Sequence, residues 1–416
     1  MYLEFLFAIV IPLSHIAGIF FAFQAILISR TPQASIGWAL GLIVIPYLTI
    51  PLFLVFGESR FSGYHHAGDG DHPLLERALD DALTALGPHR AALVDEFREV
   101  PHLVEKIAHL PPTSGNDAKL LIDGQETFDA ICAGLDRAEH IALIQFFIFR
   151  DDAVGLRLKR HVLSARERGV TVRVLIDQVG SRKLGKKYRA ELRDAGVFLE
   201  VFTTNRDRGR RFRINFRNHR KLVIIDGREA FLGGLNVGDE YLGRDPHFGP
   251  WRDTFVQVTG PIVRALQLPF LEDWYFTTGD VLELSWDVPE PTGSMTAFSI
   301  PCGPDRPWKA APAAYLEIIR AAKHRLWFAT PYFVPENALC TAIAHAAIRG
   351  VDVRILLPQF ADHLFPWLSS FTFYPGMREA GVRIYRYQPG FMHQKVVLAD
   401  NDLAVVGSTN VDYRSF

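Results

Sequence analysis

Two segments of the chain place chemically active residues at the same spacing: a histidine, a lysine two positions later, and an aspartate five positions after the lysine. These residues are His219, Lys221, Asp226, His393, Lys395 and Asp400. Side chains at positions i and i+2 of a strand project from one face, so each imidazole is expected to share a cleft with its ammonium. Such a pair suits a phosphodiester, because the lysine neutralises phosphate oxygens while the histidine attacks phosphorus or transfers a proton.

The duplication of this spacing favours catalysis over a solvent-exposed pair of no consequence. Histidine titrates near neutral pH, so one copy is predicted to be the nucleophile and the other a general acid and then base. We assign these roles to His219 and His393 in that order, and the reverse order stays open. Each motif is followed at the same offset by a Gly-x-x-Asn segment that offers further donors to the phosphate oxygens. The predicted substrate-binding residues are Gly233, Gly234, Asn236, Ser408 and Asn410.

The two aspartates have two interpretations. Asp226 and Asp400 follow short apolar runs, so each either orients a histidine or closes a turn at the end of a strand. Two lysines and the hydrogen-bond donors around them can carry the charge of a phosphate group. Neither a metal nor another cofactor is therefore predicted.

An internal repeat provides the elements that must position these residues. Residues 168–177 read Arg-Gly-Val-Thr-Val-Arg-Val-Leu-Ile-Asp, and residues 349–358 read Arg-Gly-Val-Asp-Val-Arg-Ile-Leu-Leu-Pro. Apolar β-branched runs alternate with helical segments in both halves, which indicates βαβ units and a mainly parallel, buried sheet. The sequence predicts an α/β protein in which two similar repeats, residues 116–290 and 291–416, pack around one active site.

The first 58 residues are expected to form a transmembrane hairpin. Neither Phe5–Ile28 nor Ile36–Phe56 contains a charged side chain, and each meets the roughly 20 residues that a helix needs to cross a bilayer. A cleaved signal peptide fits less well, because a basic n-region is missing and the apolar run is too long. A buried hairpin of a soluble protein fits less well too, because the apolar residues cover all faces. Residues 59–115 are predicted to be a linker followed by a helical segment.

The distribution of charged residues weakly indicates the orientation in the membrane and suggests a class of binding partner. Arg30 lies in the turn, against Arg60 and Arg77 after the second stretch, so the positive-inside rule leans towards a cytoplasmic catalytic part. Overall charge is balanced, with 45 basic and 46 acidic residues, but residues 182–221 hold fourteen Lys or Arg against four Asp or Glu. Beside a membrane anchor such a segment attracts anionic lipids. Nucleic-acid binding and a solvated loop without a role are the alternatives.

Three scattered cysteines, with no Cys-x-x-Cys pair, argue against a disulfide scaffold or a zinc site. The histidines and aspartates between His65 and His72 are interpreted as a solvated linker rather than a metal site. The sequence gives no indication of the oligomeric state.

The paired motifs resemble those of the phospholipase D superfamily, and the surrounding sequence is similar to bacterial cardiolipin synthases over nearly the whole chain. The resemblance rests on the two His-x-Lys segments and on four further stretches, Gly233–Tyr241, Trp251–Thr254, Thr330–Pro335 and Asn410–Phe416. Gly234 stands where the wider superfamily has serine, although the synthases commonly have two glycines there. The synthases continue past the position of Phe416 with another strand and an acidic residue. Either this member is short, or its second repeat is incomplete at the C-terminus.

The resemblance implies a phosphatidyltransferase of the bacterial inner membrane, with phosphatidylglycerol and membrane lipids as partners. It would transfer a phosphatidyl group from one phosphatidylglycerol to another, release glycerol, and pass through a phosphohistidine intermediate. Two alternatives remain. The first is a phospholipase D-type hydrolase, or a transferase that uses another headgroup or alcohol. The second is an inactive membrane protein that binds lipid. Nucleases share this superfamily, but the two apolar stretches argue against nucleic acid as a partner.

Overall fold

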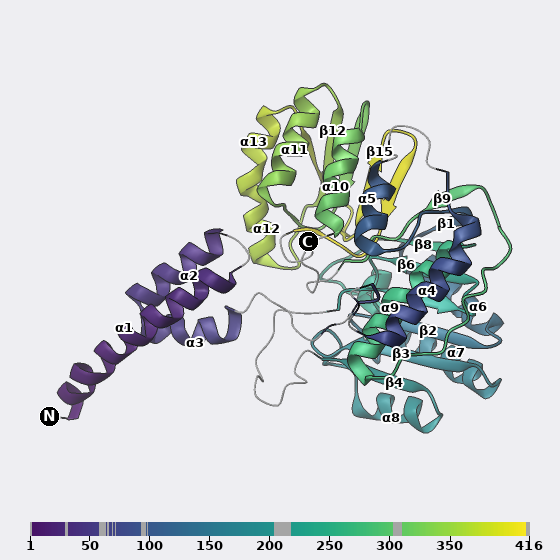
Figure 1. Ribbon diagram of the computed structural model, residues 1–416, viewed down its shortest axis with the longest axis horizontal. Helices are drawn as coiled ribbons and strands as arrows, with labels where there is room; N and C mark the ends of the chain where they lie inside the picture. The colour runs from purple at the N-terminus through teal and green to yellow at the C-terminus, as the bar shows by residue number, and fades with distance from the viewer. Residues whose placement is uncertain are drawn as a thin grey trace. The chain divides into compact units, whose positions relative to one another are not determined.

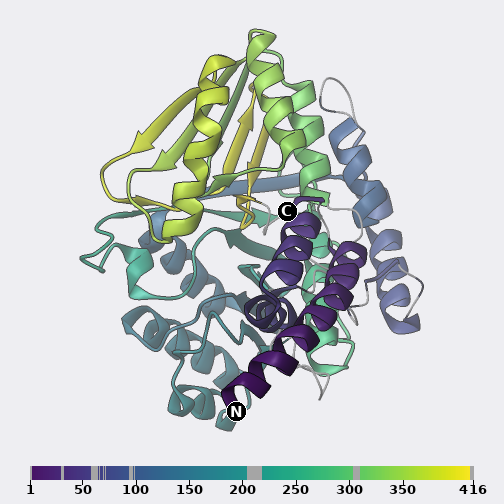
Figure 2. The same cartoon turned by 90° about the vertical axis from the view of Figure 1, so that its left-hand side faces the viewer.

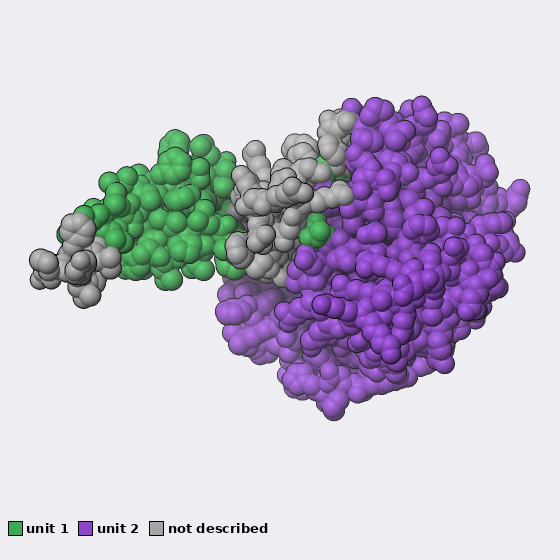
Figure 3. Space-filling view, turned by 90° about the horizontal axis from the view of Figure 1, so that it is seen from below, with its two compact units in different colours: residues 1–64, 203–217 green, residues 65–202, 218–416 purple. Residues whose placement is uncertain are grey.

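The computed structural model describes residues 2–29, 32–57, 64, 66–68, 70, 72–92, 97, 99–203, 218–302 and 310–412. By their internal contacts the residues form two compact units (Figure 3). The first comprises residues 1–64 and 203–217, and the second comprises residues 65–202 and 218–416. The densest part of the basic segment, residues 206–213, lies outside the described residues, as do His65, Asp69 and Asp71 of the expected linker.

The first unit is helical. Its helices are α1 (Tyr2–Ile28), α2 (Pro32–Val44) and α3 (Pro46–Phe56), and the two shorter ones lie beside the C-terminal half of α1 (Figures 1 and 2). A small core of Ala22, Ala25, Leu42 and Phe53 joins them. Within the described residues, one helix is long and apolar enough to cross a membrane, with a candidate span over Ala8–Ile28. His15 lies in it, and its Nδ1 is 3.0 Å from the Ile43 carbonyl oxygen of α2.

The second apolar stretch differs from the single span predicted for Ile36–Phe56. It forms two helices of 13 and 11 residues, and neither alone is long enough to cross a bilayer. The interruption falls at Ile45, whose φ of −133° and ψ of 60° lie outside the helical region. Pro46 is the cause, because its ring disfavours helical angles at the residue before it and it has no N–H to donate. The two-span hairpin therefore remains a prediction.

The second unit contains two main sheets, and the larger has eight strands in the order β4-β3-β2-β5-β6-β8-β1-β9. Its strands are β1 (Thr113–Ile122), β2 (Ile141–Phe146), β3 (Thr171–Asp177), β4 (Phe198–Phe202), β5 (Leu222–Ile225), β6 (Glu229–Gly233), β8 (Thr254–Thr259) and β9 (Met295–Ala297). Strands β2, β3 and β4 pair in parallel, and β5 pairs antiparallel with β2.

Helices cover both faces of this sheet, which explains why its central strands are apolar runs rather than alternating patterns. On one face lie α6 (Asp123–Arg137), α7 (Ala153–Glu167) and α8 (Lys186–Asp194), whose apolar residues share a core with β2 and β3. On the other lies α9 (Ile262–Thr278), where Trp274 stacks beneath Arg173 of β3 and Asp273 accepts a hydrogen bond from Gln145 of β2. The helices α4 (Pro73–Leu86), against α9, and α5 (Glu99–Ala108) precede the sheet, with a short 3-10 turn at Gly87–His89 between them.

The smaller sheet repeats the pattern with five strands in the order β13-β12-β10-β15-β16. They are β10 (Arg325–Ala329), β12 (Asp352–Pro358), β13 (Arg383–Tyr387), β15 (Val396–Ala399) and β16 (Leu403–Val406). Here too three strands run in parallel and the strand after the His-x-Lys segment pairs antiparallel. The helices α10 (Ala310–Ala321), α11 (Asn337–Ile348) and α13 (Tyr374–Glu379) bury one face, and α12 (Leu364–Ser370) lies at one end of the sheet (Figure 1). The prediction of an α/β protein with two similar repeats is confirmed.

Two short pairings fasten the loops at the ends of these sheets. Strand β7 (Trp251–Arg252) of the first half pairs in parallel with β14 (Phe391–Met392) of the second, and β11 (Phe333–Val334) pairs with β17 (Val411–Asp412). Immediately after β14, the backbone N–H of His393 donates to the Arg252 carbonyl at 2.9 Å. Backbone hydrogen bonds from the first half thus fix the position of the second His-x-Lys segment.

The motif aspartates close hairpin turns. Asp226 and Asp400 both have a φ of 51°, an uncommon backbone conformation that aspartate tolerates better than most residues. The Asp226 carboxylate accepts the backbone N–H groups of residues 139–141, and the Asp400 carboxylate accepts those of residues 323–325, at 2.8–2.9 Å. Burial alone would raise the pKa of Asp400, but these three donors outweigh it and lower that pKa. Each aspartate therefore anchors the start of the neighbouring strand, β2 or β10.

We expect Asp400→Ala to lower the free energy of unfolding by about 3 kcal/mol, because three N–H groups lose a charged acceptor and a β-carbon stays at positive φ. Asp400→Gly keeps the backbone relaxed and should lose less, and Asp400→Asn least. Chemical denaturation followed by tryptophan fluorescence measures this order. Because the folded-state pKa is lowered, the advantage over Asp400→Asn is present at neutral pH and disappears as the pH falls below about 4. Unchanged stability with abolished turnover in Asp400→Ala would instead indicate a chemical role.

Candidate active site

Two buried lysines lie at the centre of the site. Lys221 and Lys395 directly precede β5 and β15, and their side chains are 3% and 4% exposed. Each Nζ donates to the carbonyl oxygen of the histidine two positions before it, at 2.6 Å for Lys221 and His219. Burial and the charge of Lys395 lower the pKa of Lys221 to about 7. Burial lowers the pKa of Lys395 to about 8. The charge of Lys395 thus acts on Lys221, across the two motifs.

His393 is held by a carboxylate from the other half of the unit. Its Nδ1 lies 3.0 Å from Oδ2 of Asp253, which is fully buried, and 2.8 Å from Nζ of Lys395. Burial alone would raise the pKa of Asp253, but the hydrogen bond with His393 and the charge of Lys395 outweigh it. An ionised Asp253 favours the tautomer whose proton is on Nδ1, whereas donation from the Lys395 ammonium favours a lone pair there. Burial and Lys395 lower the pKa of His393, and Asp253 opposes them.

His219 occupies a more open position. Its side chain is exposed at the surface of the unit, and its ring stacks on Phe147 with the centroids 4.1 Å apart and the planes at 27°. Phe147 follows β2 directly, and Lys221 Nζ lies 5.5 Å from the same ring. The stacking on Phe147 thus fixes the plane of the imidazole.

Further carboxylates offset the charge of the lysines. Asp177, at the end of β3, acts electrostatically on Lys221, and Asp362 and Asp412 act on Lys395. The Tyr332 hydroxyl donates to Asp362, and burial together with that carboxylate raises the pKa of Tyr332, so the phenol stays protonated at neutral pH. These groups let two ammonium side chains stay close together in a buried place.

The predicted substrate-binding residues divide into three groups. Asn236 is used within the fold: its Oδ1 accepts the Ile148 N–H at 3.0 Å, and its Nδ2 donates to the Tyr241 hydroxyl at 3.1 Å. Asn410 is buried, and its Oδ1 has no hydrogen-bond partner among the described residues. Ser408 is half-buried after β16. Asn410 and Ser408 therefore remain candidates for contact with a ligand, whereas the Asn236 amide positions the loop after β2.

The paired glycines serve close packing. A β-carbon on Gly233 would lie 2.4 Å from the Thr254 carbonyl oxygen, and one on Gly234 would lie 2.2 Å from Oδ1 of Asp253. Only glycine at position 234 lets the Asp253 carboxylate occupy its present place beside His393 without a shift of the neighbouring atoms.

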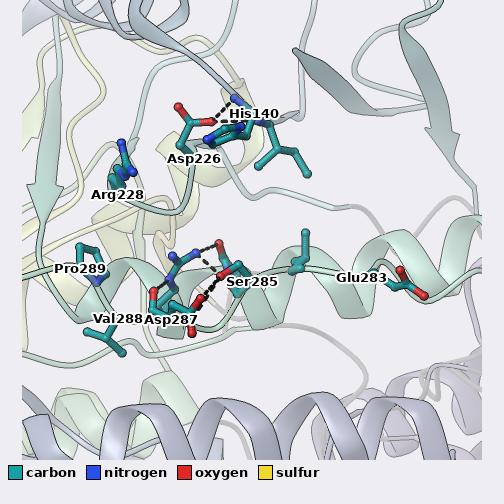
Figure 4. Close-up of a pocket in the computed structure, with 12 residues that line it drawn as sticks. His140, Asp226, Arg228, Glu283, Ser285, Asp287, Val288 and Pro289 are labelled. Atoms are coloured by element: carbon teal, nitrogen blue, oxygen red, sulfur yellow. Dashed lines mark hydrogen bonds between the residues drawn. The ribbon is translucent and has the colours of Figure 1, made fainter. Parts of the chain in front are cut away.

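Asp226 lies away from the lysines. It follows β5 whereas Lys221 precedes it, and five residues of extended chain separate them by roughly 16 Å. Asp226 lines a cavity of about 460 Å³ that includes His140, Arg264 and the loop at Ser285–Asp287 (Figure 4). The arrangement matches the turn-closing interpretation of the motif aspartates, because Asp226 and Asp400 accept backbone N–H groups, among them those of His140 and His324.

The residues that the motif search missed are Phe147, Asp177, Asp253, Tyr332 and Asp362. Asp253 and Tyr332 lie in two stretches that carry the family resemblance, Trp251–Thr254 and Thr330–Pro335. That resemblance was the available signal, and it assigned no role to either residue.

Two α/β domains that each bring one His-x-Lys segment to a common place define a phospholipase D-like protein. The sequence profile described as "Cardiolipin synthase, PLD-like domain" matches residues 131–246 and 315–416. Cardiolipin synthase A of Pseudomonas entomophila (strain L48) is 42% identical over 99% of this chain and 86% of its own length. That of Pseudomonas syringae pv. syringae (strain B728a) is 40% identical with the same coverage. The chain belongs to the cardiolipin synthase family, and it is a phosphatidyltransferase of the phospholipase D superfamily.

Among solved structures, phosphatidylserine synthase of Haemophilus influenzae Rd KW20 is similar in fold, with a TM-score of 0.56 and 14% sequence identity. The similarity covers 77% of this chain and 84% of that one. At this level of identity the likeness concerns the fold.

Replacing Asp253 by asparagine keeps a side chain of the same shape but removes the charge that raises the pKa of His393. Burial and Lys395 still lower that pKa, so it should fall further, and the alkaline limb of the pH–rate profile, above which His393 has lost its proton, should move to lower pH. At pH 7 we expect the rate to fall by about a hundredfold or more, the usual effect of impairing an acid–base group. Phospholipid turnover measured against pH tests this. Asp129→Asn, on the surface of α6, is the matched control, and an unchanged profile in Asp253→Asn would contradict the assignment.

Proposed function

We propose that the protein transfers a phosphatidyl group from one phosphatidylglycerol to a second, producing cardiolipin and glycerol through a phosphohistidine intermediate. The observation that supports this best is the meeting of the two motifs. Lys221 and Lys395 repel each other across the site, while Asp253 of the first half bonds to His393 of the second. Family membership indicates the substrate class, and the charges offer a place for a phosphate diester.

In the first step, a ring nitrogen of His219 attacks phosphorus. The P–O bond to the glycerol headgroup breaks, and the leaving oxygen takes a proton from His393. Lys221 and Lys395 stabilise the negative oxygens of the transition state, as preorganised cations do in a buried site. Burial and Lys395 lower the pKa of His393 overall, and the Asp253 carboxylate opposes them in favour of the protonated form that the acid role needs.

In the second step, a hydroxyl of another phosphatidylglycerol loses its proton to His393 and attacks phosphorus. The His219–P bond breaks, and both histidines return to their starting state. Transfer prevails over hydrolysis when the site excludes water during the reaction. In this scheme Asn410 and Ser408 assist at the phosphate, while Asp226 and Asp400 support the strands.

For the membrane we propose a multi-pass anchor in the bacterial inner membrane, with the catalytic unit on the cytoplasmic side. Helix α1 supplies one span, and α2 with α3 supplies a second that is kinked at Pro46. Proline is tolerated in spanning helices because neighbouring helices satisfy the freed backbone groups. The domains are then residues 1–58, 59–115, 116–290 and 291–416. Protease added to sealed inverted vesicles should digest the catalytic unit, and protection there would refute this orientation.

The purified full-length protein in phosphatidylglycerol vesicles should release glycerol and form cardiolipin in equal amounts, because each transfer yields one of each. Both products are measured by chromatography and mass spectrometry. Phosphatidic acid as the main product would favour a hydrolase instead. Absence of turnover with every phospholipid offered would favour a lipid-binding protein.

His219→Ala and His393→Ala should each reduce turnover by roughly a thousandfold, because one removes the nucleophile and the other the acid–base group. In quenched wild-type enzyme, an acid-labile phosphatidyl adduct should map to His219 by mass spectrometry. An adduct on His393 would reverse the two roles. His140→Ala is the control, because the His140 side chain is exposed at the far end of β2. Full activity in His393→Ala would contradict the two-histidine mechanism.

A further inference from the structure

The segment around α12 exposes an unusual number of large apolar side chains. Within residues 360–371, five are exposed: Phe360 at 63%, Leu364 at 60%, Phe365 at 83%, Leu368 at 48% and Phe371 at 41%. The stretch Gln359–Phe373 contains no Lys, Arg or Glu, and its one acidic residue is Asp362. Contiguous apolar surface of this kind marks a site of interaction with a protein or a membrane.

Three of these five side chains lie in α12 itself and share one face, whereas Phe360 precedes the helix and Phe371 follows it. Leu364, Phe365 and Leu368 follow helical spacing, and the opposite face is held by the fold. There, the Ser370 hydroxyl is 2.7 Å from the Tyr374 hydroxyl, and Arg386 donates to that same hydroxyl at 2.7 Å. Phe371 packs on Trp367 and Tyr374 beneath the Arg386 guanidinium and borders the face, whereas Leu364, Phe365 and Leu368 are the exposed residues of the helix itself.

This apolar face continues from the candidate active site. Asp362, two residues before α12, accepts the hydrogen bond of Tyr332 and acts electrostatically on both Lys395 and His393. His363, at the start of the helix, lies with its ring centroid 6.3 Å from that of Tyr332. A phosphate held by Lys395 would therefore have the α12 face as its apolar neighbour.

We propose that the α12 face, comprising Phe360, Leu364, Phe365, Leu368 and Phe371, docks on the lipid bilayer and inserts at the level of the acyl chains beside the active site. The inference rests on the proposed function. The reactive phosphate of a phospholipid lies at the headgroup level while its acyl chains stay in the hydrocarbon, so a site that takes lipid from a bilayer needs apolar surface next to its phosphate-binding group. An interfacial helix with aromatic and leucine residues on one face meets this need.

Photo-crosslinking identifies the occupant without requiring turnover. Benzoylphenylalanine replaces Phe365 in the full-length protein, which is reconstituted in vesicles of phosphatidylglycerol and phosphatidylethanolamine and irradiated. We expect adducts with lipid. The control position is Ile348, which is 71% exposed at the far end of α11, where lipid adducts should be absent. Crosslinks from position 365 only to a second copy or to the N-terminal helices, or equal lipid labelling at both positions, would overturn the proposal.

Activity measurements separate docking from chemistry. The triple variant Leu364→Ser, Phe365→Ser and Leu368→Ser should lose at least roughly tenfold in turnover of phosphatidylglycerol in vesicles, since three apolar contacts with lipid are lost. Its turnover of monomeric dihexanoyl phosphatidylglycerol should stay within about twofold of wild type, as should both rates in Ile348→Ser. Equal losses on both substrates, or no loss on vesicles, would contradict docking. If the wild type turns over neither substrate but position 365 labels lipid, the proposed function fails and the docking surface stands.

Discussion

The arrangement of the candidate active site depends most on the contact between His393 and Asp253. This contact joins residues 140 positions apart, and it forms because β7 and β14 pair in parallel and bring the two halves together by their backbones. The absence of a side chain at Gly234 leaves room for the Asp253 carboxylate. Nζ of Lys395 lies 2.8 Å from Nδ1 of His393, the same nitrogen that contacts Asp253. Without this contact the two His-x-Lys segments would be separate. With it, charged side chains of one half act on those of the other.

Those charges would be unstable in isolation. Two ammonium groups in a buried place lower each other's affinity for protons, and this effect is visible in the pKa of Lys221. The carboxylates that offset them, Asp177, Asp253, Asp362 and Asp412, come from several loops of both halves. An incoming phosphate diester would complete the same balance. The affinity for an anionic substrate would therefore depend on charged residues of both halves, and each half alone supplies only some of these charges.

The repeat could be predicted from the sequence because it depends on local patterns of apolar residues. The spacing of His219 and Lys221 predicted that both lie on a strand, whereas they directly precede β5. Asp253 could not be assigned, because only the pairing of two-residue strands brings it to His393. The role of Asp226 stayed open, since a carboxylate five residues after a lysine has no preferred partner until the strands are arranged. Apolarity alone also concealed the interruption at Ile45, although Pro46 signals it.

The aspartate turns have a consequence for how this family can diversify. In the proposed mechanism, the segment of eight residues from His219 to Asp226 has the reactive histidine at its first position and the anchoring aspartate at its last, and β5 separates the two. Replacement of the histidine would remove its proposed role in catalysis, whereas the aspartate would still hold the hairpin turn in place. Descendants that retain the fold and bind lipid without turning it over are thus accessible by single substitutions. Loss of the aspartate, in contrast, would be selected against even in a copy that had abandoned chemistry.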